Sequence, residues 1–453
     1  MKRRLRDLLQ DLAEEAPPVS EMTPRLARRL RRKQAKVAAA SVVALAVLVA
    51  GATYAVQAAR TALANRPVAA PTAGPVLPAA RCGEGWHVAS GPSLRGDRQE
   101  RLFSLGAVSA VDAWAVGERW APYQTSPAVR LGPYPLIEHW DGRKWTIVPA
   151  QDPHHWNASL FAVAVLGADD AWAVGGFRSF GSTPGESPLI EHWDGRNWTA
   201  MTVPRLAHGA GTSQELIAVA GSSPDDVWAL GHSSSNGATY MNRLLHWDGR
   251  SWRLVPSPQS HASYGVSLLM DVAVDRAGRA WAVGGRLHGI GEGSVFDGAL
   301  VQTWDGSSWR AAQAPGRALP LIAVATTGPR VVWAIRRPFL SASPESYLVG
   351  GARGSTAVMR WTNAGWVTAL STEGVLNDIA VADNHSAWVV GARRGPLLLH
   401  WNGASWIRIT RAPPVRLPMG LSAVTVAVNK DALALGVSGL RPGSQNALWT
   451  HCA

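Results

Sequence analysis

Short apolar segments alternate with clusters of Gly, Asp, Asn and Ser along most of the chain, with a period of about 52–57 residues. Within each period, a segment resembling Asp-Ala-Trp-Ala-Val-Gly follows an apolar stretch and a short turn. Its seven versions stand at 112–117, 170–175, 226–231, 279–284, 331–335, 386–391 and 431–436. Brief apolar runs bounded by turn residues predict β-strands.

A second signature, His-Trp-Asp-Gly-x-x-Trp, lies near the end of each period. Its six versions stand at 139–145, 192–198, 246–252, 303–309, 360–366 and 400–406. The Asp-Gly, Asn-Gly or Ala-Gly pair inside it predicts a tight hairpin. Each period therefore holds four strands. The sequence predicts an all-β fold, a seven-bladed β-propeller of four-stranded blades over residues 81–453.

The two ends of this region supply the missing seventh hairpin. Residues 448–452 align with 136–140, and residues 82–86 align with 141–145. We therefore expect the C-terminus to form the third strand of one blade and the start of the region to form the fourth, which closes the ring. The two cysteines, Cys82 and Cys452, fall beside this junction, and we predict a disulfide between them in an oxidising compartment.

Tryptophan is unusually frequent, and 19 of the 22 recur at three positions of the repeat. A large aromatic ring repeated at one position of each unit predicts packing between neighbouring blades. Trp120, Trp156 and Trp449 lie outside this pattern.

The first eighty residues follow a different pattern. Residues 37–59 carry no charge and are mostly apolar, enough to cross about 30 Å of hydrocarbon as one transmembrane helix. A basic tail, 1–36, precedes them, and a Pro- and Ala-rich tether, 60–80, follows. The positive-inside rule places the N-terminus in the cytoplasm and the propeller outside the plasma membrane, as a single-pass protein. A cleaved signal peptide is the alternative, but the tail and the apolar run are both long for one.

The formal net charge of +12 does not predict nucleic-acid binding. Eleven Lys or Arg and five Asp or Glu fall within residues 1–36, so this tail alone carries +6. Leu5, Leu8, Leu9 and Leu12 recur at helical spacing in it. Such a short amphipathic helix would lie on anionic lipid or bind a cytoplasmic partner.

The Asp-Gly-x-x-Trp turn resembles the Asp-box of sialidase-type propellers. The Trp-Ala-Val-Gly strand resembles that of photosystem II assembly-factor propellers, and the glycine-ended strands are similar to kelch repeats. With its tail and single span, the chain resembles the membrane-tethered propellers of actinobacteria. The sialidase resemblance implies an Arg triad, a Tyr nucleophile with a Glu, and an acid Asp, which no motif assigns to positions here. The actinobacterial resemblance implies a role near anti-sigma systems, although the tail lacks a His/Cys zinc pattern.

The remaining motifs predict no catalytic set, metal or cofactor. The histidine of the second signature recurs in four units, and equivalent positions of different blades lie too far apart to share a metal ion. These residues are His139, His192, His246 and His400. The acidic residue before the second strand predicts an Asx turn there. Its versions are Asp112, Asp170 and Asp226.

Long variable loops are predicted at one end of the propeller. They join the second strand to the third (118–135, 177–188, 232–243, 286–299 and 336–356) and one blade to the next (149–159, 201–214 and 256–267). The tether would enter at the opposite end, so this long-loop end would point away from the membrane. Irregular loops on a rigid scaffold are a common place for binding.

An arginine follows the second strand in five of the seven units. These candidate binding residues are Arg119, Arg178, Arg286, Arg336 and Arg393. A ring of guanidinium groups could clamp phosphate or carboxylate groups. Trp120 and Trp156 in the same loops could stack on a sugar ring. Solvated arginines and ordinary loop packing are the alternatives.

Three functions are compatible with these features. The favoured one is a non-enzymatic, membrane-anchored receptor or scaffold whose long-loop end binds an anionic envelope polymer or a partner protein. The second is an anti-sigma-like transmembrane regulator with the propeller as its sensor. The third is a glycan-acting hydrolase or lyase, which needs paired carboxylates in the central channel. The predicted loops offer few acids for that role: Glu118, Glu186, Glu292 and Glu345.

Overall fold

The computed structural model describes part of the chain. The described residues are 86–451, except 91–99, 121–132, 152–156, 180–184, 207–212, 236–238, 259–260, 263–264, 289–294, 317–318, 339–355, 410–419, 428 and 438–445. Two compact units divide the chain, Met1–Pro75 and Val76–Ala453. The predicted tail, membrane span and tether all lie outside the described residues. In the part of the chain that the structure describes, no helix is long and apolar enough to cross a bilayer.

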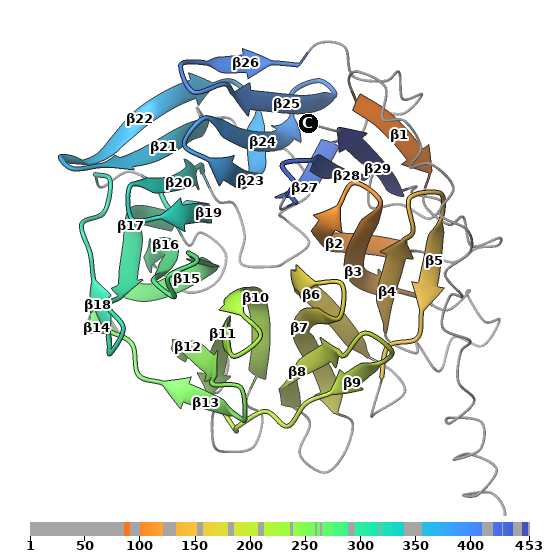
Figure 1. Ribbon diagram of the computed structural model, residues 1–453. Coiled ribbons are helices and arrows are strands. Elements are labelled where there is room, and N and C mark those ends of the chain that lie inside the picture. Colours follow the sequence, from red (N-terminus) through yellow and green to blue (C-terminus); the bar gives the residue numbers. More distant parts are fainter. Residues whose placement is uncertain are drawn as a thin grey trace, which may run out of the picture. The chain divides into compact units, whose positions relative to one another are not determined.

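Seven antiparallel sheets surround a common centre as the blades of a propeller (Figure 1). From the inner strand outward, blade one comprises β2 (Glu100–Ser109), β3 (Asp112–Arg119), β4 (Tyr134–Trp140) and β5 (Trp145–Val148); blade two comprises β6 (Ala158–Gly167), β7 (Asp170–Ser179), β8 (Gly185–Trp193) and β9 (Trp198–Ala200); and blade three comprises β10 (Ser213–Ser223), β11 (Asp226–Ser235), β12 (Thr239–Trp247) and β13 (Trp252–Val255). Blade four comprises β15 (Gly265–Val274), β16 (Ala280–His288), β17 (Val295–Trp304) and β18 (Trp309–Ala311); blade five comprises β19 (Leu321–Gly328), β20 (Val331–Arg336), β21 (Thr356–Thr362) and β22 (Gly365–Thr372); and blade six comprises β23 (Val375–Asp383), β24 (Ser386–Ala392), β25 (Pro396–Trp401) and β26 (Trp406–Arg408). Blade seven comprises β27 (Gly420–Val426), β28 (Ala432–Val437), β29 (Asn446–His451) and β1 (Trp86–Ser90). A two-residue strand, β14 (His261–Ala262), adds to the inner edge of blade four. The predicted seven-bladed, four-stranded propeller is confirmed.

The chain ends meet in blade seven, where β29 pairs with β1 and Trp86 lies opposite His451. The split blade predicted from the sequence is therefore confirmed, and Trp86 matches Trp145 as expected, but the predicted alignment of residues 448–452 with 136–140 is wrong by one residue. Ala432 pairs with His451 as Ala113 of blade one pairs with Trp140. His451, and not Cys452, thus holds the third-strand position next to the turn.

The residue types at the third-strand positions agree with this register. The corrected pairing gives Leu448 the third-strand position that holds an aliphatic side chain in the other six blades: Ile137, Ile190, Leu244, Val301, Val358 and Leu398. Trp449 takes the neighbouring position, which holds Glu, Gln, Met or Leu and no β-branched residue in the other blades. The sequence alignment matched His451 to His139, because both are histidines. In the structure, backbone pairing and side-chain packing set the register.

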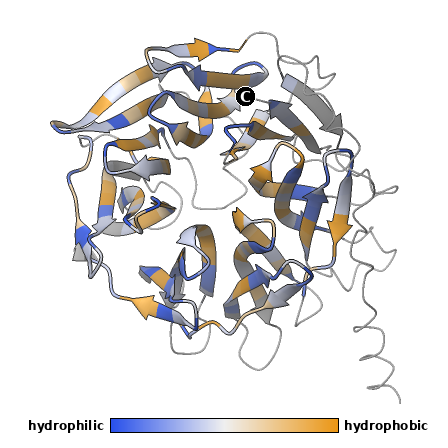
Figure 2. Cartoon of the chain, in the orientation of Figure 1, coloured by the Kyte–Doolittle hydropathy of each residue, from blue (hydrophilic) through white to orange (hydrophobic). Residues whose placement is uncertain are grey.

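Tryptophan packing between blades is confirmed. The ring of Trp114 in β3 lies 4.8 Å from Trp193 and 5.2 Å from Trp198 of blade two, measured between centroids, and the second contact is edge-to-face. The same arrangement recurs around the ring, and seven apolar clusters join neighbouring blades, including blade seven to blade one. Hydrophobic residues are accordingly spread over all the sheets (Figure 2). Each such aromatic pair contributes about 0.5–1.5 kcal/mol beyond its area burial.

A β-bulge interrupts the inner strand of every blade. In blade one the pairing shifts between Leu102 and Ser104, which leaves Phe103 as the extra residue. The extra residues of the other blades are Phe161, Ile217, Met270, Ile322, Asn377 and Ser422. The glycine that ends the Trp-Ala-Val-Gly segment faces this bulge. A Cβ on Gly117 would lie 1.8 Å from the carbonyl oxygen of Arg101, so the two backbones of blade one could not approach this closely with a larger residue. Blade five has its bulge with Arg336 in place of the glycine.

Several predicted loops are shorter than the sequence indicated. The clearest case is 232–243, because β11 continues to Ser235 and β12 begins at Thr239. Backbone pairing of these two strands extends the ladder beyond the repeated segment, which the repeat alone could not predict.

Candidate binding site in the central cavity

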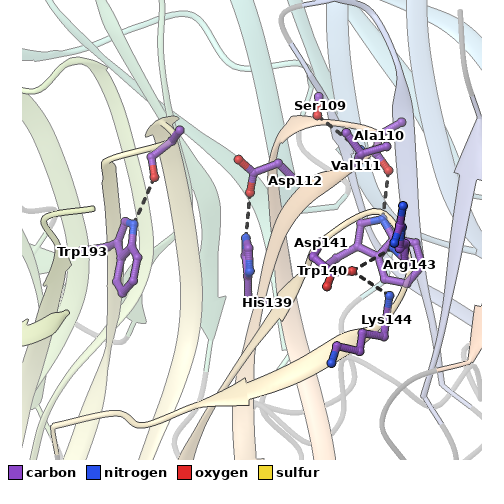
Figure 3. Close-up of polar contacts among 11 residues, drawn as sticks. Ser109, Ala110, Val111, Asp112, His139, Trp140, Asp141, Arg143, Lys144 and Trp193 are labelled. Atoms are coloured by element: carbon purple, nitrogen blue, oxygen red, sulfur yellow. Dashed lines mark hydrogen bonds and ion pairs between the residues drawn. The ribbon is translucent and has the colours of Figure 1, made fainter. Parts of the chain in front are cut away.

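The repeated histidines belong to the tight-turn end of the propeller and are structural. His139 Nε2 lies 2.8 Å from Asp112 Oδ1 (Figure 3). The same pair recurs as His192–Asp170 and His246–Asp226. The Asx-turn role predicted for Asp112 is wrong, because its carboxylate bonds a third-strand side chain. The Asx turn lies at Asp141 instead, whose Oδ1 accepts the backbone N–H groups of Arg143 and Lys144. No group of three His, Cys, Asp or Glu among the described residues is placed to hold a metal ion.

The predicted arginines lie at the ends of the second strands, and hence at the long-loop end. Arg119 and Arg286 share one register position, two residues beyond the repeated glycine, and Arg393 has the same spacing. Arg336 stands at the glycine position itself, opposite Leu321. Arg178 lies in β7, and its side chain is outside the described set.

These arginine side chains have different surroundings. The Arg119 guanidinium lies 5.9 Å from the centroid of the Tyr134 ring. Arg393 donates to the Glu373 carboxylate at 2.6 Å, and Arg286 is exposed. The structure therefore puts arginines at one end of the propeller on separate blades, and whether they act together stays a prediction.

Of the two predicted loop tryptophans, Trp156 lies outside the described residues. The Trp120 indole N–H donates to Glu118 Oε1 at 3.2 Å. Glu118 is itself buried, and its other oxygen accepts the hydroxyl of Ser159 in blade two at 2.7 Å. This acid, predicted as a loop residue, is thus a link between blades and holds Trp120 in place.

A cavity of about 400 Å³ occupies the centre of the propeller, lined by the inner strands of all seven blades. Ser213 at the start of β10, His232 near the end of β11 and Tyr240 at the start of β12 also line it. Ser213 follows the connection between blades two and three, and His232 and Tyr240 flank the connection between the second and third strands of blade three. Both kinds of connection lie at the long-loop end. The cavity therefore reaches the long-loop end of the propeller.

The bulges form the apolar part of the cavity wall. The extra residues in blades one to five are Phe103, Phe161, Ile217, Met270 and Ile322, and all of them line the cavity. The two phenyl rings lie 5.7 Å apart and are half-buried. In blades six and seven the equivalent residues are Asn377 and Ser422, so the wall changes from apolar to polar around the ring.

Two carboxylates beside the bulges tie neighbouring blades together. Asp271 Oδ1 accepts the N–H of Val272, and its Oδ2 accepts the N–H of Val324 in blade five, each at 2.8 Å. Asp378 repeats this arrangement toward Val424 of blade seven. Burial raises the pKa of Asp271 to about 8 and that of Asp378 to about 6, although the backbone donors oppose the rise. Both carboxyl groups have a structural use.

A second pair of carboxyls lies where blades two and three meet. Glu186 of β8 accepts the hydroxyl of Ser213, whereas Glu215 of β10 has no hydrogen-bond partner among the described residues. Burial, and then the charge of Glu186, raise the pKa of Glu215 to about 7. Burial lowers the pKa of the nearby His232 to about 4, so that this ring is neutral near pH 7. Its Nε2 lies 2.7 Å from the carbonyl oxygen of Leu269.

Sequence reasoning missed this cavity set, with the exception of Glu186. A signal for this cavity exists in the inner strands, because a four-residue motif recurs there in all seven units. Its first position is Leu, its second is any residue, its third is Ala, Ser or Asp, and its fourth is an aliphatic residue. The second position of this motif is the bulge residue. Because its identity changes from blade to blade, a search for repeated residues passes over it.

Comparisons with known proteins identify no family. No family model matches the sequence, and no curated protein matches it. Solved structures include YCF48 bound to D1 peptide (13% identity, TM-score 0.48, covering 82% of this chain and 98% of that one) and YCF48 from Cyanidioschyzon merolae (15%, 0.48, 81% and 98%). A Trypanosoma rangeli sialidase in complex with the inhibitor DANA also matches (12%, 0.44, 67% and 57%). At such identities the likeness concerns the fold and no site residue.

Proposed function

We propose that this chain is a non-catalytic binding propeller that takes its ligand into the central cavity from the long-loop end. The cavity carries the proposal, because all seven blades contribute to a space of about 400 Å³. Such a volume suits a small ligand or one group of a larger one. The segment 37–59 would anchor the propeller in the plasma membrane with this end directed outward.

The test is to fill the cavity and ask whether a ligand is lost. Ser422→Phe places a ring at a bulge position where blades one and two already carry Phe. The full-length chain and this variant are incubated with cell-envelope extract, repurified and denatured, and the released compounds are identified by mass spectrometry. Thr199→Phe, at an exposed position of β9, is the matched control. A ligand released from the parent and the control but not from Ser422→Phe supports the proposal; equal release from all three contradicts it.

The long-loop arginines support binding of an anionic envelope polymer at the rim of the same end. The shared register of Arg119 and Arg286 favours this second contact. Co-sedimentation of the chain with isolated envelope at low and high salt tests it, because exposed charge contacts are screened above about 0.1 M salt. Salt-sensitive binding that is lost on changing Arg119, Arg178 and Arg286 to Ala is expected. Binding that survives these changes contradicts the rim contact.

Glycan hydrolysis is a second candidate function, favoured by the pair Glu215 and Glu186 in the cavity. A carboxyl group with a pKa of about 7 suits a general acid at neutral pH. Release of 4-methylumbelliferone from a panel of its glycosides, abolished in Glu215→Gln, would establish this activity. Turnover that is absent, or equal in the variant, rejects it.

A further inference from the structure

Acidic side chains outnumber basic ones in the cavity wall. Four carboxyl groups line it, those of Glu186, Glu215, Asp271 and Asp378, against one guanidinium group, that of Arg337. Arg337 is committed to the polar side, where it donates to Asn377 Oδ1 at 2.8 Å. Asp271 and Asp378 already accept two backbone N–H groups each.

Glu215 is the carboxyl group in the wall that these contacts leave available. Glu215 and Glu186 both line the cavity, and the charge of Glu186 is felt at Glu215, so ionisation of one carboxyl disfavours ionisation of the other in a partly buried place. A cation between them would remove this repulsion and gain charge-assisted hydrogen bonds. An anionic ligand would instead meet the same two groups unfavourably.

The apolar wall independently indicates the other part of the ligand. Phe103 and Phe161 belong to blades one and two, and Glu186 also belongs to blade two. Half-buried phenyl rings that face a cavity leave apolar surface for a ligand to cover. The faces of such rings also attract organic cations.

We propose that the cavity accepts an organic ammonium ion, its charged nitrogen at Glu215 and Glu186 and its apolar body against Phe103 and Phe161. This inference rests on the proposed function, for which it names the ligand class. The ammonium group could belong to a free amine or to a lysine side chain of a polypeptide, since both present the same chemistry.

Three probes of similar shape and different charge test the proposal by titration calorimetry on the full-length chain. Phenethylammonium should bind at least about tenfold more tightly than neutral 2-phenylethanol, and 3-phenylpropionate more weakly still. Glu215→Gln should abolish the preference for the cation, and Phe161→Ile, which copies the bulge residue of blade five, should weaken its binding. A short peptide with an internal lysine separates the two sources: tighter binding of the peptide indicates a polypeptide ligand, and weaker binding indicates a free amine.

Glu373→Gln is the control, because this carboxylate is exposed and outside the cavity lining. It should leave the preference unchanged, and thermal melts of each variant show that it is folded. Equal affinity for the three probes, or a cation preference that survives Glu215→Gln, overturns the inference. The proposed function would still stand in that case if Ser422→Phe abolishes ligand release, so the two failures are distinguishable.

Discussion

At the residue scale, the repeated glycine allows a close backbone approach beside the inner-strand bulge, whereas blade five keeps its bulge with Arg336 at this position. In blade two, a Cβ on Gly175 would lie 1.9 Å from the carbonyl oxygen of Ser159. We expect Gly175→Ala to lower the free energy of unfolding by about 3 kcal/mol or more, because backbone atoms would have to move. Gly328→Ala is the control, since nothing lies within 4 Å of the added methyl group. Denaturant unfolding measures both, and similar midpoints would contradict the close approach.

A buried carboxyl predicts how stability depends on pH. Glu138 is 1% exposed, and burial, followed by the charge of Glu100, raises its pKa from 4.5 to about 8. Folding therefore favours the protonated form. The stability contributed by Glu138 is fully present below about pH 4.5 and is lost as the pH rises through about 8.

Glu138→Gln should remove this dependence, because an amide does not ionise. Blade four already has Gln302 at the equivalent position, where its Nε2 donates to the carbonyl oxygen of Pro258. We expect the melting temperature of the variant to exceed that of the parent by a margin that grows between pH 5 and pH 9. Parallel melting curves across this range would show that Glu138 is ionised in the folded protein.

At the scale of structural elements, Asp378 links strand β23 of blade six to strand β27 of blade seven. Its Oδ2 accepts the N–H of Val424 in β27 at 2.9 Å. Asp378→Ala leaves this N–H without its acceptor, so we expect a loss of about 1–3 kcal/mol in the free energy of unfolding. Ala323 holds the equivalent position in blade five, so Ala is sterically acceptable there. A loss no greater than that of the exposed control Glu373→Ala would contradict the role of this link.

Strands, hairpins and tryptophan contacts were predictable because they repeat as residue identities. Trp114 and its equivalents must pack on the next blade wherever a blade exists, and Asp141 marks a tight turn by its own chemistry. The bulge was not predictable in this way, since it is a shift in pairing between two strands. The extra residue at the bulge differs between blades, from Phe103 to Ser422, so the residues of the cavity wall do not recur as one residue type. Glu215 was missed because its importance comes from Glu186 on another blade.

Closure of the ring belongs to the scale of the whole molecule. Without β1 and β29 paired, blade seven would lack its outer strand and the cluster that contains Trp86, Trp388 and Trp449 would open. The pairing brings residues far apart in sequence into one sheet, so the last blade depends on both ends of the propeller. The seven-fold repeat is thus closed in the blade to which both ends of the propeller contribute strands.

The predicted disulfide would reinforce this place. Trp86 lies opposite His451, as Trp145 lies opposite Trp140 in blade one. Counting from these pairs, Cys452 and Cys82 both fall on the position of Asp141, the first residue of the turn. Both cysteines lie outside the described residues, so the bond stays a prediction. It would close a loop of about 370 residues, which the chain-entropy model values at about 6 kcal/mol.

Cys452→Ser should therefore lower the melting temperature of the oxidised protein, and a thiol reductant should lower that of the parent to the same value. The reductant should then leave Cys452→Ser unchanged, because the chain contains two cysteines and the variant cannot form the bond. Free-thiol titration of the unfolded parent, made before reduction, should find none. If the parent shows two free thiols and has the same melting temperature as Cys452→Ser, the predicted disulfide does not form. Pairing of β1 with β29 then closes the ring without a covalent bond, and the burial of Trp86 and Trp449 stabilises the closure alone.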